Sequence, residues 1–426
     1  MEVLHHRCAG LDISKKDVKV CVRTVPAGRV RAVQKVTTWS SMTAQVLALR
    51  EYLIEMAVTC VVMEATGDYW KPFYYVLEDG PFEVMLVNAH EAKNVPGRKT
   101  DVSDAAWLAQ LGAHGLLRAS FVPPPPVRQL RDLTRARTQI VREQTRETNR
   151  LEKILEDAGI KLSLVATDIT GVSARRILRA LVAGERDPQA LAQLSVRALR
   201  RKIPQLEPAL QGRFTEHHGF MVEVHLDRIE QLEATAAKIT DRIEQVIEPF
   251  RGARELISSI PGISTSVAEV IIAETGADMD QFPTPGHLAS WAGVCPGHNE
   301  SAGRVKSAKT RPGNRHLKGA LGIAAMSNAR HKGTHLHAKY KRIAKRRGRS
   351  KALVAIEHHL LTVIWTLLRT GAFYQDPGPD YYTHRNPNAA KKHALRQLQA
   401  LGYDVTLHPH TEVAVPRQSS CTKVGC

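Results

Sequence analysis

The first 115 residues alternate between short apolar, β-branched runs and runs with helical spacing, and this order restricts the fold more than any other feature of the chain. Strands are predicted at Cys8–Ile13, Val18–Val22, Val30–Val36, Thr59–Met63 and Glu83–Val87. A Pro-Ala-Gly turn at 26–28 joins the second and third of these strands. Helices are predicted at Ala44–Met56, Tyr69–Leu77 and Val102–Leu111. The pattern therefore indicates an α/β domain.

A run of prolines, Pro123–Pro126, separates this domain from a helical remainder. Such a run is stiff and extended, so we place a boundary there. One long charged helix is predicted over 127–158, and a second helix over about 214–246 is expected to return antiparallel to it. Further helices are predicted at 285–292, 314–329, 334–347, 351–369 and 388–401, with a short strand-like segment at 403–407. We expect an α/β domain over 1–122, a helical coiled-coil arm over 123–251, an all-α domain over 252–372 and a basic appendage over 373–426.

The segment Leu256–Ala273 reads LISSIPGISTSVAEVIIA, an apolar helix, a Pro-Gly turn and a second helix. This is the helix-hairpin-helix pattern, whose tight turn needs Gly262 and whose second helix offers backbone N–H groups to a DNA phosphate. An ordinary packing element of two helices explains the same pattern equally well.

The charge of the chain predicts a polyanionic partner. The formal net charge is +18, and sixteen Lys or Arg residues but no Asp or Glu lie between Arg304 and Lys351. Dense cations are favoured on nucleic acids because they release counterions from the phosphates. Arg142, Arg146 and Arg150 form a second basic row, at i, i+4 spacing on the long helix, where a structural role is equally consistent with the pattern.

The same composition favours a cytoplasmic, nucleoid-associated protein without a membrane partner. No signal peptide is evident, and the most apolar stretch, Leu353–Leu368, contains Glu357, His358 and His359. The six cysteines show no CxxC pairing, so reduced thiols are the simplest interpretation.

Acidic residues lie at the carboxyl ends of two predicted strands and at the start of a predicted helix. Three strands, a helix and further strand–helix units are the order of an RNase-H-like domain. In that topology Asp12 and Glu64 end neighbouring strands, while Asp101 and Asp104 lie one helical turn apart. Each acid alone has a structural explanation; Asp101, for example, is well placed to be a helix N-cap.

Taken together, the four acids predict a divalent metal site. Like charges held close are unfavourable unless a cation neutralises them. Oxygen-only ligands favour Mg²⁺ or Mn²⁺, and a pair of such ions suits phosphodiester chemistry.

Three segments that carry these acids, GLDISKKDVKV, VVMEATGDYW and KTDVSDAAWLAQL, resemble the DEDD motifs of transposases of the insertion-sequence one-ten family. The N-terminal domain of that family is similar to the Holliday-junction resolvase RuvC. The segments ISSIPGISTSVAEVIIAETG and WAGVCPGHNESAGRVKSAKTRPGNRHLKGAL resemble the C-terminal transposase domain of the same family. The resemblance covers nearly the whole chain apart from the last fifty residues.

The resemblance implies a recombinase that excises and inserts its element, guided by an element-encoded RNA that pairs with donor and target DNA. It implies that Asp12, Glu64, Asp101 and Asp104 bind metal and that Ser301 forms a covalent 5′-phosphoserine link to DNA. The family often has Gly directly after this serine; here Ala302 precedes Gly303, and Ser307 is the alternative nucleophile. The resemblance also implies a homo-oligomer, a dimer or tetramer, whose subunits share a site.

Ser301 lies in PGHNESAGR, which reads as a loop able to bring backbone close to a phosphate. Cations follow it, and we expect them to neutralise phosphates: Arg304, Lys306, Lys309, Arg311, Arg315 and Lys318. No His, Lys or Asp stands at the spacing of an activating base, so metal coordination of the phosphate is the expected means of activation.

Three other functions share part of this evidence. A RuvC-like nuclease would use the four acids with water as its nucleophile and would leave Ser301 idle. A binding protein with a degenerate RNase-H scaffold would need none of the acids. An actin-like sugar kinase is prompted by GLDIS, but the second half of the chain lacks the glycine-rich phosphate loops that such kinases need.

Overall fold

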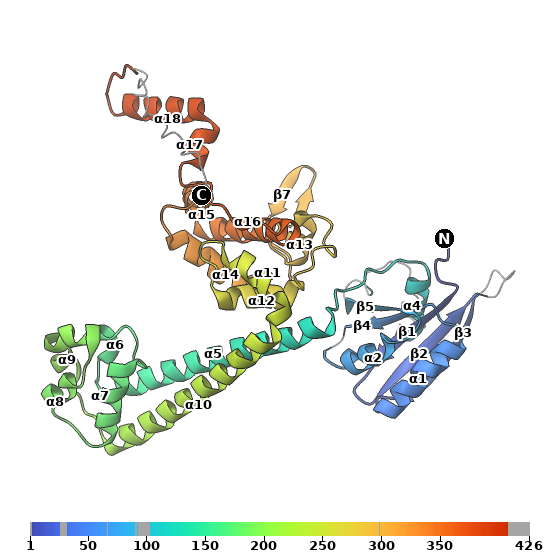
Figure 1. Ribbon diagram of the computed structural model, residues 1–426, viewed down its shortest axis with the longest axis horizontal. Helices are drawn as coiled ribbons and strands as arrows, with labels where there is room; N and C mark the ends of the chain where they lie inside the picture. The colour runs from blue at the N-terminus through green and yellow to red at the C-terminus, as the bar shows by residue number, and fades with distance from the viewer. Residues whose placement is uncertain are drawn as a thin grey trace, which may run out of the picture. The chain divides into compact units, whose positions relative to one another are not determined.

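The computed structural model describes residues 2–25, 32–65, 67–89, 92, 103–297 and 299–407. It separates into two compact units, Met1–Pro123 and Pro124–Cys426 (Figure 1). The first is a mixed α/β unit and the second is almost entirely helical, which confirms the two fold classes that the sequence predicts.

The first unit is built on a five-stranded sheet with the order β3-β2-β1-β4-β5. Its strands are β1 (Arg7–Ile13), β2 (Asp17–Thr24), β3 (Val33–Ser40), β4 (Cys60–Glu64) and β5 (Glu83–Val87). The pairs β1–β2 and β2–β3 are antiparallel, whereas β1–β4 and β4–β5 are parallel. The three parallel strands therefore end at one edge of the sheet and begin at the opposite edge.

The third strand ends four residues later than predicted. β3 pairs with β2 along its whole length, from Val33 opposite Thr24 to Ser40 opposite Asp17. The partner strand decides this length, because residues Thr37 to Ser40 all pair with residues of β2 although they do not continue the apolar run of the predicted strand. Residues 30 and 31, and the turn predicted at 26–28, lie outside the described residues.

Helices cover both faces of the sheet. They are α1 (Thr43–Glu55), α2 (Trp70–Leu77) and α4 (Asp104–Ala113). Leu49 and Phe73 of α1 and α2 pack with Leu11 in one core, while Trp107 of α4 packs with Cys8 in another. The alternation of side chains along β1 thus places Leu11 on one face and Cys8 on the other.

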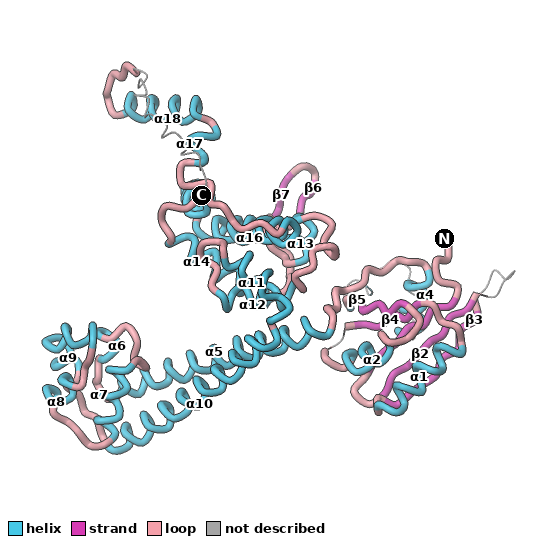
Figure 2. Tube along the Cα trace, viewed as in Figure 1, coloured by secondary structure: helices cyan, strands magenta, loops and turns pink. Residues whose placement is uncertain are grey.

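Two long helices, α5 (Pro125–Asp157) and α10 (Glu216–Val246), lie side by side in the second unit (Figure 2). Gln144 contacts Glu233 and Asp157 contacts His218, so residue numbers fall on one helix as they rise on the other, and the pair is antiparallel as predicted. Between the two helices the chain forms a small helical cluster with its own core, for which the sequence analysis made no prediction. It contains α6 (Leu162–Val165), α7 (Val172–Val182), α8 (Pro188–Gln193), η1 (Arg197–Lys202) and α9 (Ile203–Ala209).

Further helices of this unit are η2 (Glu248–Phe250), α11 (Arg251–Ser258), α12 (Thr265–Thr275), α13 (Pro285–Trp291), α14 (Arg315–Arg330), α15 (His335–Arg347) and α16 (Arg349–Thr370). Most of these helices contribute to a second core, in which α11, α13, α14 and α15 pack against α16 and α12 packs against α5 and α14. A hairpin of β6 (Asn299–Ser301) and β7 (Arg304–Ser307) precedes α14. Two helices follow the core, α17 (Tyr381–Arg385) and α18 (Pro387–Ala400). The strand-like prediction at 403–407 is wrong, because no strand of the described chain pairs with that segment.

The most apolar stretch of the sequence, Leu353–Leu368, lies in a helix that has the length of a membrane span, although its polar residues argued against one. α16 has 22 residues, and an 18-residue window within it has a mean hydropathy of 1.3, enough to cross a membrane by length and composition alone. In the structure its apolar side, including Ile356, Leu360 and Ile364, is buried in the helical core. An interior helix needs the same apolar composition as a membrane span, so this feature has an explanation in the fold.

Candidate functional site

Two of the four acids singled out in the sequence lie at the edge where the parallel strands end. Asp12 is the next-to-last residue of β1 and Glu64 is the last residue of β4, and these strands pair in parallel with Leu11 opposite Met63. Asp104 is the first residue of α4, which packs on β1. The structure thus brings Asp12, Glu64 and Asp104 to one place from three separate elements.

The electrostatics of Asp12 show how close these acids are. Burial and the negative charges of Asp104 and Glu64 raise the pKa of Asp12, and the positive charge of Lys19 opposes them. Lys19 faces Asp12 directly across the β1–β2 ladder. A half-buried carboxylate that is repelled by two others is the environment that a divalent cation would relieve.

Gly10 allows α4, and with it Asp104, to lie close to Asp12. A Cβ at Gly10 would lie 2.1 Å from the carbonyl oxygen of Ala105 and 2.4 Å from the amide nitrogen of Ala109. The backbone of α4 therefore rests directly on the β1 backbone two residues before Asp12, which no larger residue would allow.

The fourth acid, Asp101, lies outside the described residues. The N-cap of α4 is Ser103, whose side chain accepts a hydrogen bond from the Ala106 amide. The interpretation of Asp101 as the helix N-cap was therefore wrong. Serine caps as well as aspartate, and the helix begins two residues later than predicted.

Ser301 ends β6 and pairs with Arg304 at the start of β7. The segment predicted as a loop is thus a β-hairpin. Its two-residue turn, Ala302-Gly303, has φ of 50° and 74°. Both turn residues have the left-handed backbone that a tight hairpin needs, which glycine adopts freely and alanine only with strain. Ser301 is exposed beside this turn.

A pocket of about 620 Å³ lies at the base of this hairpin. It is lined by Gly297, Asn299, Ser307, Lys309, Thr310, Arg311, Pro312 and Lys318. Three of the predicted cations therefore face one cavity, together with the half-buried Ser307, whose Oγ accepts a hydrogen bond from the Lys309 amide at 3.2 Å. Arg304 and Lys306 lie on the exposed hairpin instead.

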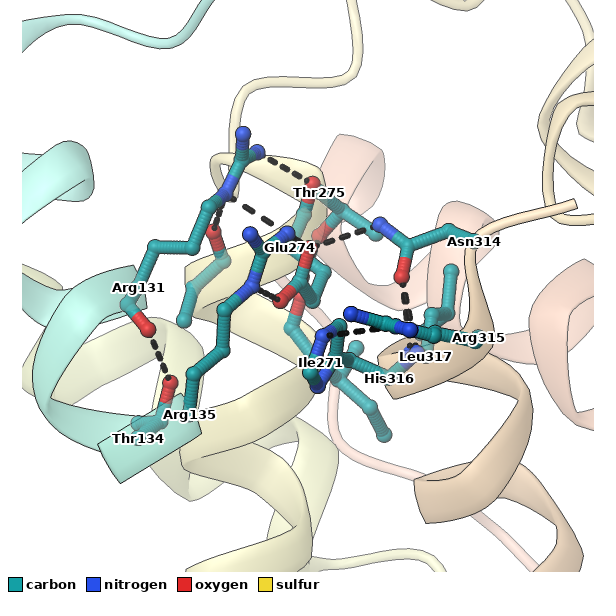
Figure 3. Close-up of polar contacts among 11 residues, drawn as sticks. Arg131, Thr134, Arg135, Ile271, Glu274, Thr275, Asn314, Arg315, His316 and Leu317 are labelled. Carbon is teal, nitrogen blue, oxygen red and sulfur yellow. Dashed lines mark hydrogen bonds and ion pairs between the residues drawn. The ribbon is translucent and has the colours of Figure 1, made fainter. Parts of the chain in front are cut away.

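A buried carboxylate, that of Glu274, fixes the start of α14 (Figure 3), the helix that carries Arg315 and Lys318. Glu274, at the end of α12, is fully buried; its two oxygens accept hydrogen bonds from Arg135 of α5, each at 2.8 Å. Asn314 donates to Glu274 at 2.6 Å and caps α14 by accepting from the His316 and Leu317 amides. Burial alone would raise the pKa of Glu274, but these hydrogen bonds and the arginine charges outweigh it and lower the pKa.

The basic row of α5, formed by Arg142, Arg146 and Arg150, is only partly available to bind a phosphate. Arg142 is exposed and lines a pocket of about 590 Å³ with His316 of α14, whose pKa is lowered by burial and by neighbouring arginines. Arg146 is also exposed, and its side chain donates to the Arg142 carbonyl at 3.3 Å. Arg150 forms an ion pair with Glu147, which offsets its charge.

Gly262 lies in the turn between α11 and α12 with φ of 80°. A Cβ there would meet the Asn328 side chain of α14 at 2.6 Å. The turn therefore needs glycine both for its backbone conformation and for the close approach of α14.

Comparisons with known proteins agree with this arrangement. A family model described as a transposase of the DEDD type of IS110 matches residues 9–160, and one described as the transposase IS116/IS110/IS902 family matches residues 254–341. The chain is 25% identical over 380 residues to the transposase for insertion sequence element IS1111A of Coxiella burnetii, covering 86% of this chain and 90% of that protein. It belongs to the IS110 family of DEDD transposases.

Two further proteins to which the chain is similar are about equally distant in sequence. An uncharacterized 42 kDa protein of insertion element IS900 from Mycobacterium paratuberculosis is 28% identical over 309 residues, covering 67% of this chain and 75% of that protein. A probable family 20 transposase from Pseudomonas aeruginosa is 22% identical over 337 residues, covering 78% and 89%. The transposase is thus a DNA-recombining enzyme, and DNA is its substrate.

Sequence reasoning missed three residues that position the sites of this transposase. Gly10 permits the approach of α4, Lys19 faces Asp12, and Glu274 links α5 to α14. The spacing of Gly10 and Asp12 within GLDIS is visible in the sequence, but the helix that rests on this glycine begins only at Asp104, far along the chain. Only a glycine inside an apolar strand hinted at such an approach.

Proposed function

We propose that this transposase cuts and rejoins DNA with a divalent metal site of Asp12, Glu64, Asp101 and Asp104 and with Ser301 as nucleophile. The convergence of Asp12, Glu64 and Asp104, with the raised pKa of Asp12, is the observation that carries the proposal. The sheet order β3-β2-β1-β4-β5, with α4 across β1, supports an RNase-H-like, RuvC-like scaffold.

The carboxylates fit a divalent cation such as Mg²⁺ or Mn²⁺. Their donors are all oxygen, and the repulsion among them disappears when a cation neutralises it. When bound, the metal would stabilise negative charge on the scissile phosphate and on the attacking and leaving oxygens. Lys19 would offset part of the carboxylate charge before the metal binds.

In the proposed reaction the Ser301 Oγ attacks the scissile phosphorus. The P–O3′ bond breaks, the serine proton passes to the departing 3′ oxygen, and the 5′ phosphate remains esterified to Ser301. Attack of another 3′ hydroxyl then rejoins DNA and returns the proton to the serine. Arg304 and Lys306 stand beside Ser301 on the hairpin and would neutralise the phosphate during both steps.

The positive surfaces would hold the nucleic acids. Lys309, Arg311 and Lys318 face one pocket, and Arg315 lies beside it at the start of α14. The exposed Arg142 and Arg146 would extend this surface along α5, with less from Arg150. We further propose that the Gly262 turn acts as a helix-hairpin-helix, that an element-encoded RNA selects the DNA sites, and that the active form is a homo-oligomer. A net charge of +18 is consistent with binding two polyanions.

The proposal is tested by incubating the full chain with Mg²⁺, candidate guide RNA and labelled donor and target DNA, then resolving covalent adducts on a denaturing gel. Wild type is compared with Ser301→Ala, Ser307→Ala and Asp12→Asn. We expect an adduct that is lost in Ser301→Ala and Asp12→Asn but retained in Ser307→Ala. Loss of the adduct in Ser307→Ala but not in Ser301→Ala would identify Ser307, which lines the pocket, as the nucleophile. Cleavage without any adduct, retained in Ser301→Ala, would show instead a nuclease that uses water.

A further inference from the structure

The edge of the sheet opposite the carboxylates gathers a different set of metal-binding side chains. Cys60 is the first residue of β4 and Glu83 is the first residue of β5, and the two are direct partners in the parallel ladder. His5 lies two residues before the start of β1. The start of each of the three parallel strands therefore supplies one side chain of a different chemical type.

These side chains lie close enough to share an ion. Ligand atoms of His5, Cys60 and Glu83 all lie within 4.8 Å of one another. His5 Nε2 is 3.9 Å from Glu83 Oε2, near the spacing of about 3.5 Å that two ligands have in a tetrahedral zinc site. To bind one ion together, the ligand atoms would have to move toward one another by about 1 Å. His5 and Glu83 can make this movement because their side chains are partly exposed, with exposed fractions of 26% and 59%.

Neighbouring groups prepare each ligand. The other ring nitrogen of His5, Nδ1, faces the Thr59 hydroxyl at 3.5 Å, which leaves Nε2 turned toward Glu83. Such a partner on the second nitrogen is typical of histidines that bind metal. Cys60 is fully buried, and it is the direct partner of Cys8 in the parallel ladder between β1 and β4. A second sulfur thus lies beside the first.

We propose that His5, Cys60 and Glu83 form a structural site for Zn²⁺ or a similar borderline divalent metal. One nitrogen, one sulfur and one oxygen ligand are the donors that zinc accepts, whereas Mg²⁺ prefers oxygen alone. The site is distinct from the carboxylate site: along β4, Cys60 lies four residues, or roughly 13 Å, before Glu64. It would leave a fourth position to water or to the Cys8 thiol.

The metal would fasten the N-terminal segment to the sheet. Residues 4 and 5 already donate hydrogen bonds to the Ala113 carbonyl at the end of α4, and the site would join them to the starts of β4 and β5. Because unfolding separates the three ligands, the ion would stabilise this unit by binding only its folded form.

Cobalt provides the test, because tetrahedral Co²⁺ bound to a thiolate gives strong visible bands and a sulfur-to-metal charge-transfer band. The full chain, reduced and freed of metal with EDTA, is titrated with Co²⁺ and then with Zn²⁺. We expect about one equivalent of Co²⁺ with the charge-transfer band, displaced by Zn²⁺. We expect His5→Gln and Glu83→Gln to weaken Co²⁺ binding by at least about tenfold and Cys60→Ala to abolish the band.

Matched controls separate this site from other ligands. His6→Gln changes the adjacent exposed histidine, and Cys21→Ala removes another fully buried thiol of the same sheet; both should bind Co²⁺ as wild type does. The proposal is overturned by a wild type without the charge-transfer band, by a band that survives Cys60→Ala, or by unchanged affinity in both His5→Gln and Glu83→Gln. These last two changes affect partly exposed side chains, so they decide the question even where Cys60→Ala does not fold.

Discussion

At the scale of single residues, Asp12 illustrates how a site can oppose folding. Burial and the charges of Asp104 and Glu64 raise its pKa above the ordinary 3.8. The folded protein then holds this proton more tightly than the unfolded chain. Without metal, the stability contributed by Asp12 therefore falls as pH rises from 3.8 through the raised pKa of the folded state.

We predict that Asp12→Asn raises the melting temperature of the metal-free protein at neutral pH and removes most of its stabilisation by Mn²⁺. The amide carries no charge to be repelled, and it is a poor ligand. In wild type, Mn²⁺ at a hundred times its Kd should add about 2.7 kcal/mol. Thermal unfolding in EDTA and in Mn²⁺ measures both effects. Asp79→Asn, an exposed change, is the control, and equal Mn²⁺ stabilisation of Asp12→Asn would refute the metal site.

At the scale of elements, the contact between α4 and β1 depends on Gly10, because only a residue without a side chain lets the two backbones approach this closely. We predict that Gly10→Ala destabilises the first unit by at least about 3 kcal/mol, because the added carbon meets rigid backbone at 2.1 Å. Any folded fraction should respond less to Mn²⁺, since α4 and Asp104 must move outward. Urea denaturation measures the loss. Gly252→Ala, in α11 with no atom near the added carbon, should change stability by no more than about 1 kcal/mol in the favourable direction.

Glu274 joins α5, α12 and α14, and its ionisation is part of the fold of the second unit. Its pKa is lowered below the ordinary 4.5, so it contributes stability above that pH which is lost as pH falls through the folded pKa. We predict that Glu274→Gln lowers the free energy of unfolding at pH 7 by about 3 kcal/mol, because it leaves Arg135 without its carboxylate.

The pH dependence distinguishes this effect from lost packing. Wild type should lose stability below about pH 4.5 more steeply than Glu274→Gln does. Glu248→Gln, which removes an exposed ion pair with Arg251, should cost no more than about 0.5 kcal/mol. Equal acid sensitivity of wild type and Glu274→Gln would show that the carboxylate charge is not what holds these helices.

At the scale of the whole molecule, the excess positive charge should govern DNA affinity. We predict that changing Lys309, Arg311 and Lys318 to Gln lowers the slope of log affinity against log salt by about 2 to 3, as expected for three phosphate contacts on duplex DNA. Binding measured by fluorescence anisotropy over a salt series gives the slope. Arg50→Gln, on α1, should leave it unchanged; an unchanged slope in the triple variant would place the DNA elsewhere.

The sequence by itself determined most of the elements and the identity of the chemistry-bearing residues. Apolar periodicity is a local property, so β5 and the long helix α5 appear within a few residues of their predicted places. Acids at strand ends and a cluster of cations are equally visible along the chain. The small helical cluster between α5 and α10, which comprises α6 to α9, was not predicted, because most of its helices are too short to show a clear period.

Only the tertiary structure decided which residues meet. Residues far apart in sequence meet in the approach of α4 to Gly10 and in the cluster of three carboxylates that includes Asp12. The same holds for the link from Glu274 to Asn314 and for the gathering of His5, Cys60 and Glu83. These contacts depend on strand register and on the close approach of backbones. The periodicity of apolar residues along the sequence contains no information about either. The turn at Ala302-Gly303 is a local exception, because its alanine adopts a backbone conformation that only the surrounding hairpin makes favourable.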